Sequence, residues 1–219
     1  ELQWLRYNCS QKIGVVRAKT LADLVSGRFE KSSTWLMAPD GRQTFEVATN
    51  PAVTRGPDGQ YYMMYKSRMP NAGHMTFWMA RSNSPMGPFK TIAPVLNTAA
   101  TACEDPCLWY DWKRKRFYAA AKYFSHSKQL VSQFGALVLL TSKDGLHWQP
   151  AGHPLISLRQ LTFRSGKTIQ LTQLERPFIY TDAKGQARAL LAAASVEDPF
   201  QDKGSAHNSF NVQIPLVGQ

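Results

Sequence analysis

Two acidic side chains stand at matching places in a repeated phrase of this sequence, and together they could carry out acid–base chemistry. Glu175 lies two residues before Pro177, and Asp105 lies directly before Pro106. Cleavage of a glycosidic bond needs two such groups, because one protonated acid gives a proton to the leaving oxygen and one carboxylate activates water. We therefore predict that Glu175 and Asp105 are the catalytic pair.

Three copies of the phrase place polar groups just before the proline of a first strand. These groups are Asn50, Glu104 with Asp105, and Glu175 with Arg176. A set that recurs at one structural position favours a shared pocket, and we expect Asn50, Glu104 and Arg176 to contact substrate. The alternative is that these groups cap the strand starts and bind loop backbone.

Two lysines interrupt the apolar strands that follow. Lys66 comes fifteen residues after Pro51, and Lys122 comes sixteen after Pro106. We predict that both lysines reach the same pocket, where they lower the pKa of a neighbouring carboxylate or contact an anionic substrate. Alternatively, each snorkels to the surface at a strand end. His126, and also His207, could enter the pocket from loops.

The elements that must position these groups repeat along the chain. Phe29, Phe89 and Trp148 mark a period of about sixty residues. Each unit reads as strand, Asp-containing turn, strand, link, strand, and a Gly-containing turn before an aromatic residue. The strands expected in the clearest units are 52–54, 61–66, 75–80, 117–123 and 135–141, and links are expected over 30–49 and 150–173, the second with a hairpin near 165–167. Antiparallel strands at this period predict the blades of a β-propeller.

The units fill residues 1–219 as one all-β domain, without a second independent domain. About three and a half units are present, because the first lacks its opening strand and the last its closing one. In residues 1–16, Trp4–Tyr7 and Ile13–Val16 read as the second and third strands of a unit. We expect a propeller that lacks its N-terminal blade or part of it, rather than one closed with four blades.

Composition narrows the partners. Charged residues make up 19% and aromatic residues 11% of the chain, which is typical of an ordered β-rich protein. No apolar run approaches the ~18 residues that span a membrane, and no signal peptide is visible. The net charge of +11 is either a solvated basic surface or a preference for anionic partners such as acidic or sulfated glycans or nucleic acid. The dense basic run 113–116 is expected at an exposed hairpin tip.

The three cysteines, Cys9, Cys103 and Cys107, do not suggest a disulfide framework. Cys103 and Cys107 are four residues apart in one predicted strand, which is roughly 13 Å and too far to bridge. With no His or Cys cluster beside them, a zinc site is not expected either, and both are predicted to be buried.

Several motifs recur through the chain: Asn50-Pro51-Ala52-Val53 with Asp58-Gly59, Ser84 with Gly87-Pro88-Phe89, Glu104-Asp105-Pro106 with Trp109-Tyr110, Ser142-Lys143-Asp144-Gly145-Leu146-His147-Trp148, and Leu174-Glu175-Arg176-Pro177. Together these motifs resemble the bacterial five-bladed β-propeller glycoside hydrolases of the family 43 and family 117 group. The resemblance covers nearly the whole chain from about Ile13.

The resemblance implies an enzyme with three carboxylates. Glu175 matches the family's general acid, and Asp105 matches the Asp that positions the acid and tunes its pKa. The family's general base is an Asp of the first blade, and the corresponding place in unit two holds Asn50, which cannot ionise. The base therefore lies on a missing N-terminal segment, or the activity has been lost or relocated. The resemblance also implies a periplasmic or secreted bacterial protein without a cofactor, apart from a structural ion in the axial channel.

The leading hypothesis is an inverting glycosidase for an oligo- or polysaccharide, with Arg176, Lys66 and Lys122 favouring an anionic sugar. The alternative is a glycan-binding propeller without catalysis. A propeller that serves as a protein or nucleic-acid scaffold rests on the positive charge alone, and we expect no nucleic-acid or membrane partner.

Overall fold

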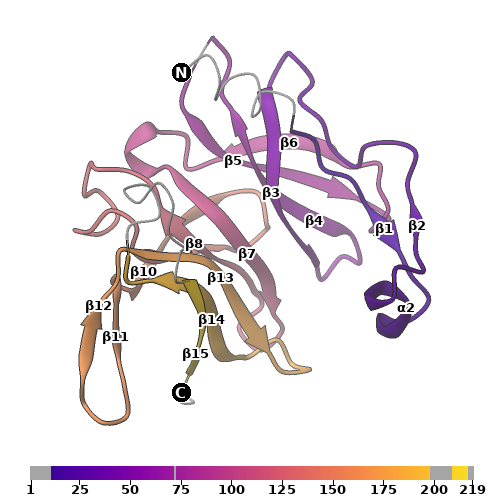
Figure 1. The fold of residues 1–219 in the computed structure, drawn as a ribbon. Helices are drawn as coiled ribbons and strands as arrows, with labels where there is room; N and C mark the ends of the chain where they lie inside the picture. The colour runs from indigo at the N-terminus through magenta and orange to yellow at the C-terminus, as the bar shows by residue number, and fades with distance from the viewer. Residues whose placement is uncertain (1–10, 72, 198–208, 217–219) are drawn as a thin grey trace.

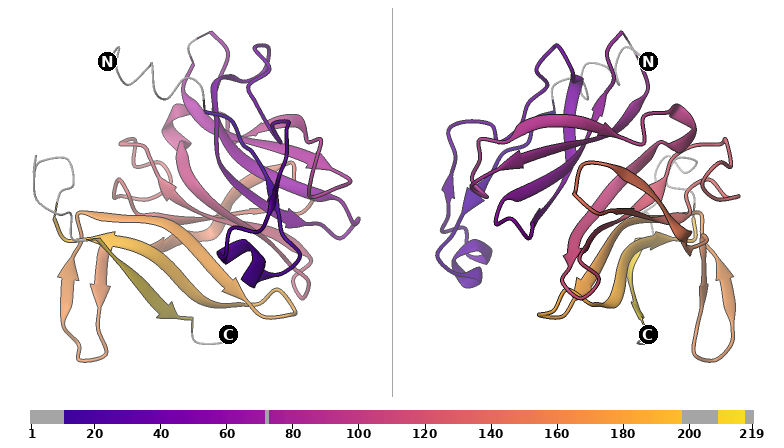
Figure 2. Two further views of the ribbon diagram at one scale, coloured as in Figure 1. Left: turned by 45° about the vertical axis from the view of Figure 1, so that its right-hand side comes forward. Right: turned by 180° about the vertical axis from the view of Figure 1, so that it is seen from behind.

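The computed structural model describes residues 11–71, 73–197 and 209–216, which are built almost wholly from antiparallel strands (Figures 1 and 2). The helices of this part are α2 (Leu21–Val25) and the 3-10 turn η1 (Ala99–Thr101). None of the described helices has the length and apolar character needed to cross a membrane.

The first large sheet pairs its strands in chain order. It comprises β3 (Phe45–Arg55), β4 (Tyr61–Arg68), β5 (Met75–Ser82) and β6 (Lys90–Val95). The β3–β4 turn contains Asp58, whose carboxylate accepts the backbone N–H of Gln60, and Gly59, whose φ of 80° suits glycine. The three strands predicted in this unit are confirmed, although β3 begins earlier than expected, inside the predicted link.

Two further sheets follow the same plan. The second comprises β7 (Cys103–Asp111), β8 (Arg116–Tyr123), β9 (Leu137–Ser142) and β10 (Trp148–Ser157), and the third comprises β13 (Gln173–Thr181), β14 (Ala187–Ser195) and β15 (Ser209–Pro215). The basic run 113–116 begins in the exposed β7–β8 turn, as predicted.

The fourth strands β6 and β10 correct the expected pattern. The part of the chain after Gln149 was predicted to be a link, yet β10 continues to Ser157. Its prolines, Pro150 and Pro154, lie on a strand at the edge of the sheet, where a missing N–H donor is tolerated. The hairpin predicted in the remainder of the link is confirmed as β11 (Gln160–Thr162) and β12 (Thr168–Gln170).

The N-terminal part differs from the expected pair of strands. The strand predicted at 4–7 lies outside the described residues. Ile13 makes an isolated bridge to Met37, and β1 (Val16–Arg17) pairs with β2 (Glu30–Lys31) in a two-stranded sheet of the described residues. The segment therefore forms a short hairpin with a helical turn, rather than two strands of a blade.

Apolar side chains join the sheets face to face. Between the first two sheets the rings of Tyr62 and Phe117 lie 4.7 Å apart, and both are almost fully buried. Truncating a buried Phe typically costs about 3–5 kcal/mol, so Phe117→Ala would loosen this contact. Between the second and third sheets, Cys107 Sγ accepts the backbone N–H of Ile179 at 3.2 Å. Cys103 and Cys107 are both free and buried, as predicted.

The first strands of the three sheets lie next to one another. β7 contacts both β3 and β13, and Figure 1 shows the three strands converging near the middle of the molecule. Side chains at equivalent positions on β3, β7 and β13 can therefore lie close to one another.

Candidate functional site

Each of the three inner strands is interrupted at the same place. The pairing register shifts between Thr49 and Ala52, between Glu104 and Cys107, and between Glu175 and Phe178. Such bulges redirect side chains and are common beside active sites. The repeated polar–proline phrase therefore marks a bulge in every sheet.

The residue before each proline has a left-handed backbone. The φ angles are 50° at Asn50, 53° at Asp105 and 51° at Arg176. Non-glycine residues seldom adopt this region, and holding one there typically costs about 1–3 kcal/mol. Three such residues at equivalent positions indicate that the fold maintains the conformation to place their side chains.

The bulges separate the polar groups into two sets, which a sequence pattern alone could not distinguish. The outer set occupies the last paired position before each bulge and consists of Thr49, Glu104 and Glu175. The bulge set consists of Asn50, Asp105 and Arg176. Asp105 and Glu104 are neighbours in the chain, yet they belong to different sets with different partners.

Lysines connect the outer set across the sheets. Lys66 Nζ lies 2.7 Å from Glu104 Oε2, and Lys122 Nζ lies 3.1 Å from Glu104 Oε1. Lys122 Nζ also donates to Glu175 Oε1. The charges thus alternate along one line from Lys66 to Glu175, and each lysine meets a glutamate of the following sheet.

Ladder pairing explains why the line ends at Glu175. Lys66 stands opposite Thr49 and Lys122 opposite Glu104, whereas Ala193 stands opposite Glu175. The third sheet therefore supplies no lysine of its own. The Glu175 side chain is 32% exposed, compared with 17% for Glu104, so Glu175 is the more accessible glutamate.

The ion pairs shift the pKa values of two groups. Burial opposes ionisation of Glu104, but the charges and hydrogen bonds of Lys66 and Lys122 outweigh it and lower the pKa of Glu104. Burial also opposes the charged form of Lys122, but its contacts with Glu175 and Glu104 outweigh it and raise the pKa of Lys122. Lowering of a carboxylate pKa is the effect that the sequence predicted for these lysines.

The surroundings of Asp105 shift its pKa in the opposite direction from that of Glu104. Its carboxylate is buried, accepts a hydrogen bond from Asn50 Nδ2, and lies 3.6 Å from Arg176 Nη1. Burial raises the pKa of Asp105; Arg176 opposes the rise, and the nearby charges of Glu104 and Glu175 add to it. A raised pKa in a cleft is a common property of functional carboxylates.

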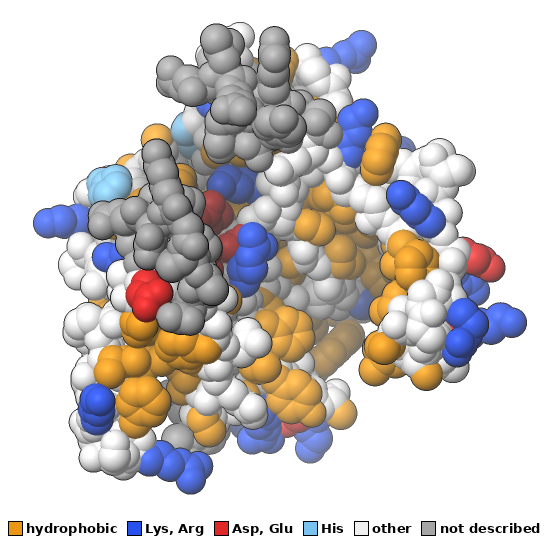
Figure 3. Space-filling view, in the orientation of Figure 1, with side chains coloured by type: hydrophobic (Ala, Val, Ile, Leu, Met, Phe, Trp, Pro, Cys, Tyr) orange, Lys and Arg blue, Asp and Glu red, His pale blue; other side chains and the backbone are white. Residues whose placement is uncertain are grey.

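Both sets line one cavity of about 590 Å³. Acidic and basic side chains lie beside each other near the centre of the face shown in Figure 3. Seven of the eight predicted site residues are in the lining: Asn50, Lys66, Glu104, Asp105, Lys122, Glu175 and Arg176. A second cavity of about 260 Å³ shares Asn50, Asp105 and Arg176 and is otherwise lined by Pro51, Pro106, Pro177 and Phe178.

Aromatic side chains complete the lining. Phe124 lies under both ammonium groups, with Lys66 Nζ 5.0 Å and Lys122 Nζ 5.8 Å from its ring centroid. Phe134 packs 5.4 Å from Phe124, and the predicted residue His126 stacks on Phe134 at 4.3 Å. His126 therefore contacts a residue of the lining without belonging to the lining itself, and His207 lies outside the described residues.

The two phenylalanines were missed from the sequence. Phe124 directly follows the strand that carries Lys122, which is the one signal that could have drawn attention to it. Phe134 lies in the loop between β8 and β9, twelve residues after Lys122, and no local pattern marks it. Both come from a loop whose path was not predictable.

The charged groups that line the cavity balance each other. Among the described residues, its lining holds Lys66, Lys122 and Arg176 against Glu104, Asp105 and Glu175. The lysine charges are used in ion pairs within the protein. Within the described lining, both lysine charges are thus already matched by glutamates of the protein.

Glu104 is too close to Glu175 to serve as an inverting base, because one ammonium group contacts both carboxylates. Inverting pairs are separated by about 6.5–9.5 Å to leave room for water. In the described lining, Asp105 is the remaining carboxylate. Within the described part of the chain, no group of three or more His, Cys, Asp and Glu residues is placed to hold a metal ion.

Comparisons with known proteins rest on structure alone. No protein-family model and no curated protein sequence matches the chain. An endo-arabinase from Bacteroides thetaiotaomicron is similar to it, with 19% identity, a TM-score of 0.59, and coverage of 92% of this chain and 66% of that one. A thermostable family-43 glycoside hydrolase is also similar, with 21% identity, a TM-score of 0.57, and coverage of 87% and 58%.

A third similar structure contains a sugar. The exo-β-1,3-galactanase from Phanerochaete chrysosporium, solved with β-1,3-galactotriose, has 13% identity, a TM-score of 0.55, and coverage of 87% of this chain and 38% of that one. This chain thus spans about two thirds or less of each of these neighbours. The fold resembles that of propeller glycoside hydrolases, as the sequence motifs predicted.

Proposed function

We propose that this chain contributes the acid side of a glycoside hydrolase site, with Glu175 as the general acid. The observation that carries the proposal is the joint placement of Glu175 and Asp105 on bulged inner strands around one cavity of about 590 Å³. Glycoside hydrolases with the same fold strengthen it, although a fold is by itself compatible with many functions.

Glu175 gives its proton to the glycosidic oxygen in this proposal. Its side chain is more exposed than that of Glu104, the other glutamate in the line of ion pairs. It also stands at the end of that line, where a sugar can approach it. Asp105 lies in the same cavity, where Asn50 and Arg176 hold its carboxylate. In this proposal it supports the site without touching the leaving group.

In this proposal Lys122 takes the positioning role that the resemblance implies for Asp105. It is Lys122 that donates to Glu175, while Asp105 is engaged with Asn50 and Arg176. Lys122 is itself fixed by Glu104. The general base, which takes the proton of the attacking water, is in our proposal a carboxylate other than the three that line the cavity in the described part of the chain.

Phe124 provides an apolar surface for the sugar. Its side chain is 44% exposed and borders the charged groups of the cavity. A pyranose or furanose ring offers C–H groups on one face and hydroxyls around its edge, so it can lie on Phe124 while hydroxyls meet Arg176 or Asn50. Because the lining charges balance, we propose a neutral saccharide as substrate in place of the anionic glycan.

The test is a product assay on the 219-residue chain with two neutral probes, α-1,5-arabino-oligosaccharides and β-1,3-galacto-oligosaccharides. We expect new reducing ends from at least one of them, and proton NMR during the reaction should show the inverted anomer first. Product of retained configuration would reject the inverting mechanism.

Calorimetry with the same two probes, read beside the product assay, separates hydrolysis from binding. Saturable binding of a probe by calorimetry, with no product on prolonged incubation, would replace the enzyme with a glycan-binding propeller. Failure of both probes to bind at millimolar concentration would reject the carbohydrate site for these sugars.

A further inference from the structure

A separate pocket lies at the other end of the first large sheet. Its volume is about 530 Å³, and it is lined by Gln60, Arg81, Ser82, Asn83, Ser84, Gly87, Pro88, Lys90, Thr91 and Ile92. Ser82 is five residues beyond Phe77, the ladder partner of Lys66, which corresponds to roughly 16 Å along the strand. None of its lining residues belongs to the candidate active site.

Positively charged side chains that donate hydrogen bonds line this pocket. Arg81 and Lys90 are in the lining, and no described carboxylate forms an ion pair with either. The Arg81 guanidinium lies over the Tyr62 ring, 5.9 Å from its centroid, and the Tyr62 hydroxyl donates to the Asp58 carboxylate. The lining itself holds no Asp or Glu.

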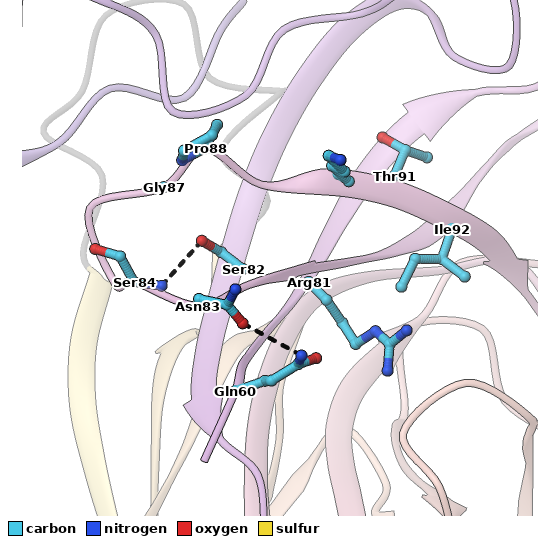
Figure 4. A pocket seen from close by; sticks show the side chains of 10 residues that line it. Gln60, Arg81, Ser82, Asn83, Ser84, Gly87, Pro88, Thr91 and Ile92 are labelled. Atoms are coloured by element: carbon cyan, nitrogen blue, oxygen red, sulfur yellow. Dashed lines mark hydrogen bonds between the residues drawn. The ribbon is translucent and has the colours of Figure 1, made fainter. Parts of the chain in front are cut away.

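Neighbouring N–H groups occupy the side-chain oxygens of Ser82 and Asn83. Ser82 Oγ accepts the backbone N–H of Ser84 at 3.1 Å, and Asn83 Oδ1 accepts Gln60 Nε2 at 3.2 Å. Figure 4 shows Arg81, Asn83 and Gln60 on one side of the pocket, opposite Thr91 and Pro88. The hydroxyl proton of Ser82 and the amide protons of Asn83 remain as donors.

The equivalent turn of the next sheet contains its own anion. Ser142 pairs with Phe117 as Ser82 pairs with Tyr61, so the two serines correspond. Two residues later stands Asp144, whose Oδ1 accepts from Ser142 Oγ at 3.0 Å and from the backbone N–H of His147 at 2.8 Å. Burial opposes ionisation of Asp144, but hydrogen bonds, first those from His147, outweigh it and lower its pKa.

The first sheet has the same turn without the carboxylate. Ser84 stands where Asp144 stands, and its Oγ accepts the N–H of Met86 two residues on, as Asp144 accepts that of Leu146. The Ser84 backbone oxygen accepts the N–H of Gly87, so this turn closes without a carboxylate. The pocket of the first sheet therefore has no negative charge of its own in this turn, although Arg81 and Lys90 line it.

We propose that this pocket binds a small oxyanion, namely a sulfate group either free or esterified to a saccharide. Arg81 provides a planar fork of donors and Lys90 a second positive charge, and both chemistries suit sulfate oxygens. Arg81 and Lys90 contribute to the net charge of +11, so anion binding at this pocket would give part of that charge a function. The inference does not depend on hydrolysis at Glu175.

The experiment is calorimetric titration of the intact chain with sodium sulfate, galactose 6-sulfate and galactose at low ionic strength. We expect binding of both sulfated probes, with an affinity that falls as sodium chloride is added, and none of galactose at this pocket. Tighter binding of galactose 6-sulfate would assign a saccharide-borne sulfate, and equal binding would assign the free ion.

Substitutions of Arg81 and Lys90 test whether sulfate binds in this pocket. Arg81→Gln combined with Lys90→Gln should weaken sulfate binding about tenfold or more, because hydrogen bonds to charged groups are strong. The matched control is Lys113→Gln with Lys115→Gln, which removes the same charge from the exposed β7–β8 turn and should leave the affinity nearly unchanged. Equal loss in both pairs would show a general charge effect and overturn the site.

A third variant tests the comparison between the sheets. Ser84→Asp places a carboxylate where Asp144 stands and should abolish sulfate binding with the thermal midpoint retained. If Ser84→Asp binds sulfate as tightly as the parent chain, the proposal fails. Saccharide cleavage should be the same in all these variants, so failure of the anion site and failure of the enzyme proposal can be distinguished.

Discussion

Lys122, on the second strand of one sheet, donates to the carboxylate of Glu175 on the first strand of the next, and the same ammonium lies 3.1 Å from Glu104. The Lys122 side chain is only 6% exposed. One buried cation therefore fixes the relative position of two glutamates that lie on different sheets.

Replacing Lys122 with Met should destabilise the fold and misplace Glu175. Removing one partner of a buried ion pair typically costs about 3–5 kcal/mol, and the partial exposure of Glu175 places the expected loss near 3 kcal/mol or below. Urea unfolding measures it. Lys66→Met is the matched control, because Lys66 meets Glu104 alone, and its cost should be smaller. Equal costs would contradict the central position of Lys122.

Replacing Glu175 with Gln should remove hydrolysis while the fold persists. General acid catalysis typically contributes about 10²–10⁴ in rate, so turnover of the cleaved oligosaccharide should fall at least about a hundredfold. Glu30→Gln, at an exposed site on β2, is the control and should keep full activity. Retained turnover in Glu175→Gln would contradict the assignment of Glu175 as the general acid.

Asp105→Asn should separate stability from activity. Burial raises the folded-state pKa of Asp105 above its ordinary value of 3.8, so ionised Asp105 favours unfolding at neutral pH, and stability rises as the pH falls through the folded pKa. The neutral amide should therefore leave the urea midpoint at pH 7 unchanged or higher, with activity lost. A clear drop in the midpoint would mean that the Arg176 contact outweighs burial.

Glu104→Gln should have the opposite effect on stability. The pKa of Glu104 is lowered from 4.5, so its contribution is fully present above pH 4.5 and is lost as the pH falls through the folded pKa. The Gln variant should be less stable at pH 7 and show a flatter loss of stability below pH 4.5. Unfolding curves from pH 7 to pH 3 check this, and parallel curves for the two proteins would contradict it.

Phe124→Ala should weaken saccharide binding more than it slows the chemical step. The variant removes the exposed ring under Lys66 and Lys122 and leaves Glu175 in place. We expect KM to rise about tenfold, in keeping with the loss of an aromatic contact, while kcat changes little. Phe163→Ala, which removes a similarly exposed ring from the β11–β12 hairpin, is the control and should leave both constants unchanged.

The repeated phrase predicted most of the inner architecture. The strands that carry Lys66 and Lys122 combine aliphatic and aromatic residues with Asp-containing turns, and both formed where expected. The proline after Asn50, Asp105 and Arg176 correctly marked equivalent positions. These features depend on local sequence, which is why the chain alone reveals them.

Other features depend on contacts between sheets and were not predictable. Glu104 and Asp105 formed one predicted group, but a backbone φ of 53° at Asp105 sends them to different partners. Neither lysine gives a hint in the sequence that its partner lies on the following sheet. Edge strands such as β10, with its prolines and half-exposed pattern, resemble loops until a neighbouring strand pairs with them.

The distances in sequence between the contacting groups bear on how the protein folds. Each sheet is made of consecutive hairpins, which close quickly because their strands are neighbours in the chain. Asn50 and Asp105, by contrast, are 55 residues apart, and Lys122 and Glu175 are 53 apart. The cavity therefore comes into being only when finished sheets dock. A kinetic intermediate with complete hairpins would show β-structure by circular dichroism and yet have no binding capacity, so the appearance of function would report the final docking step.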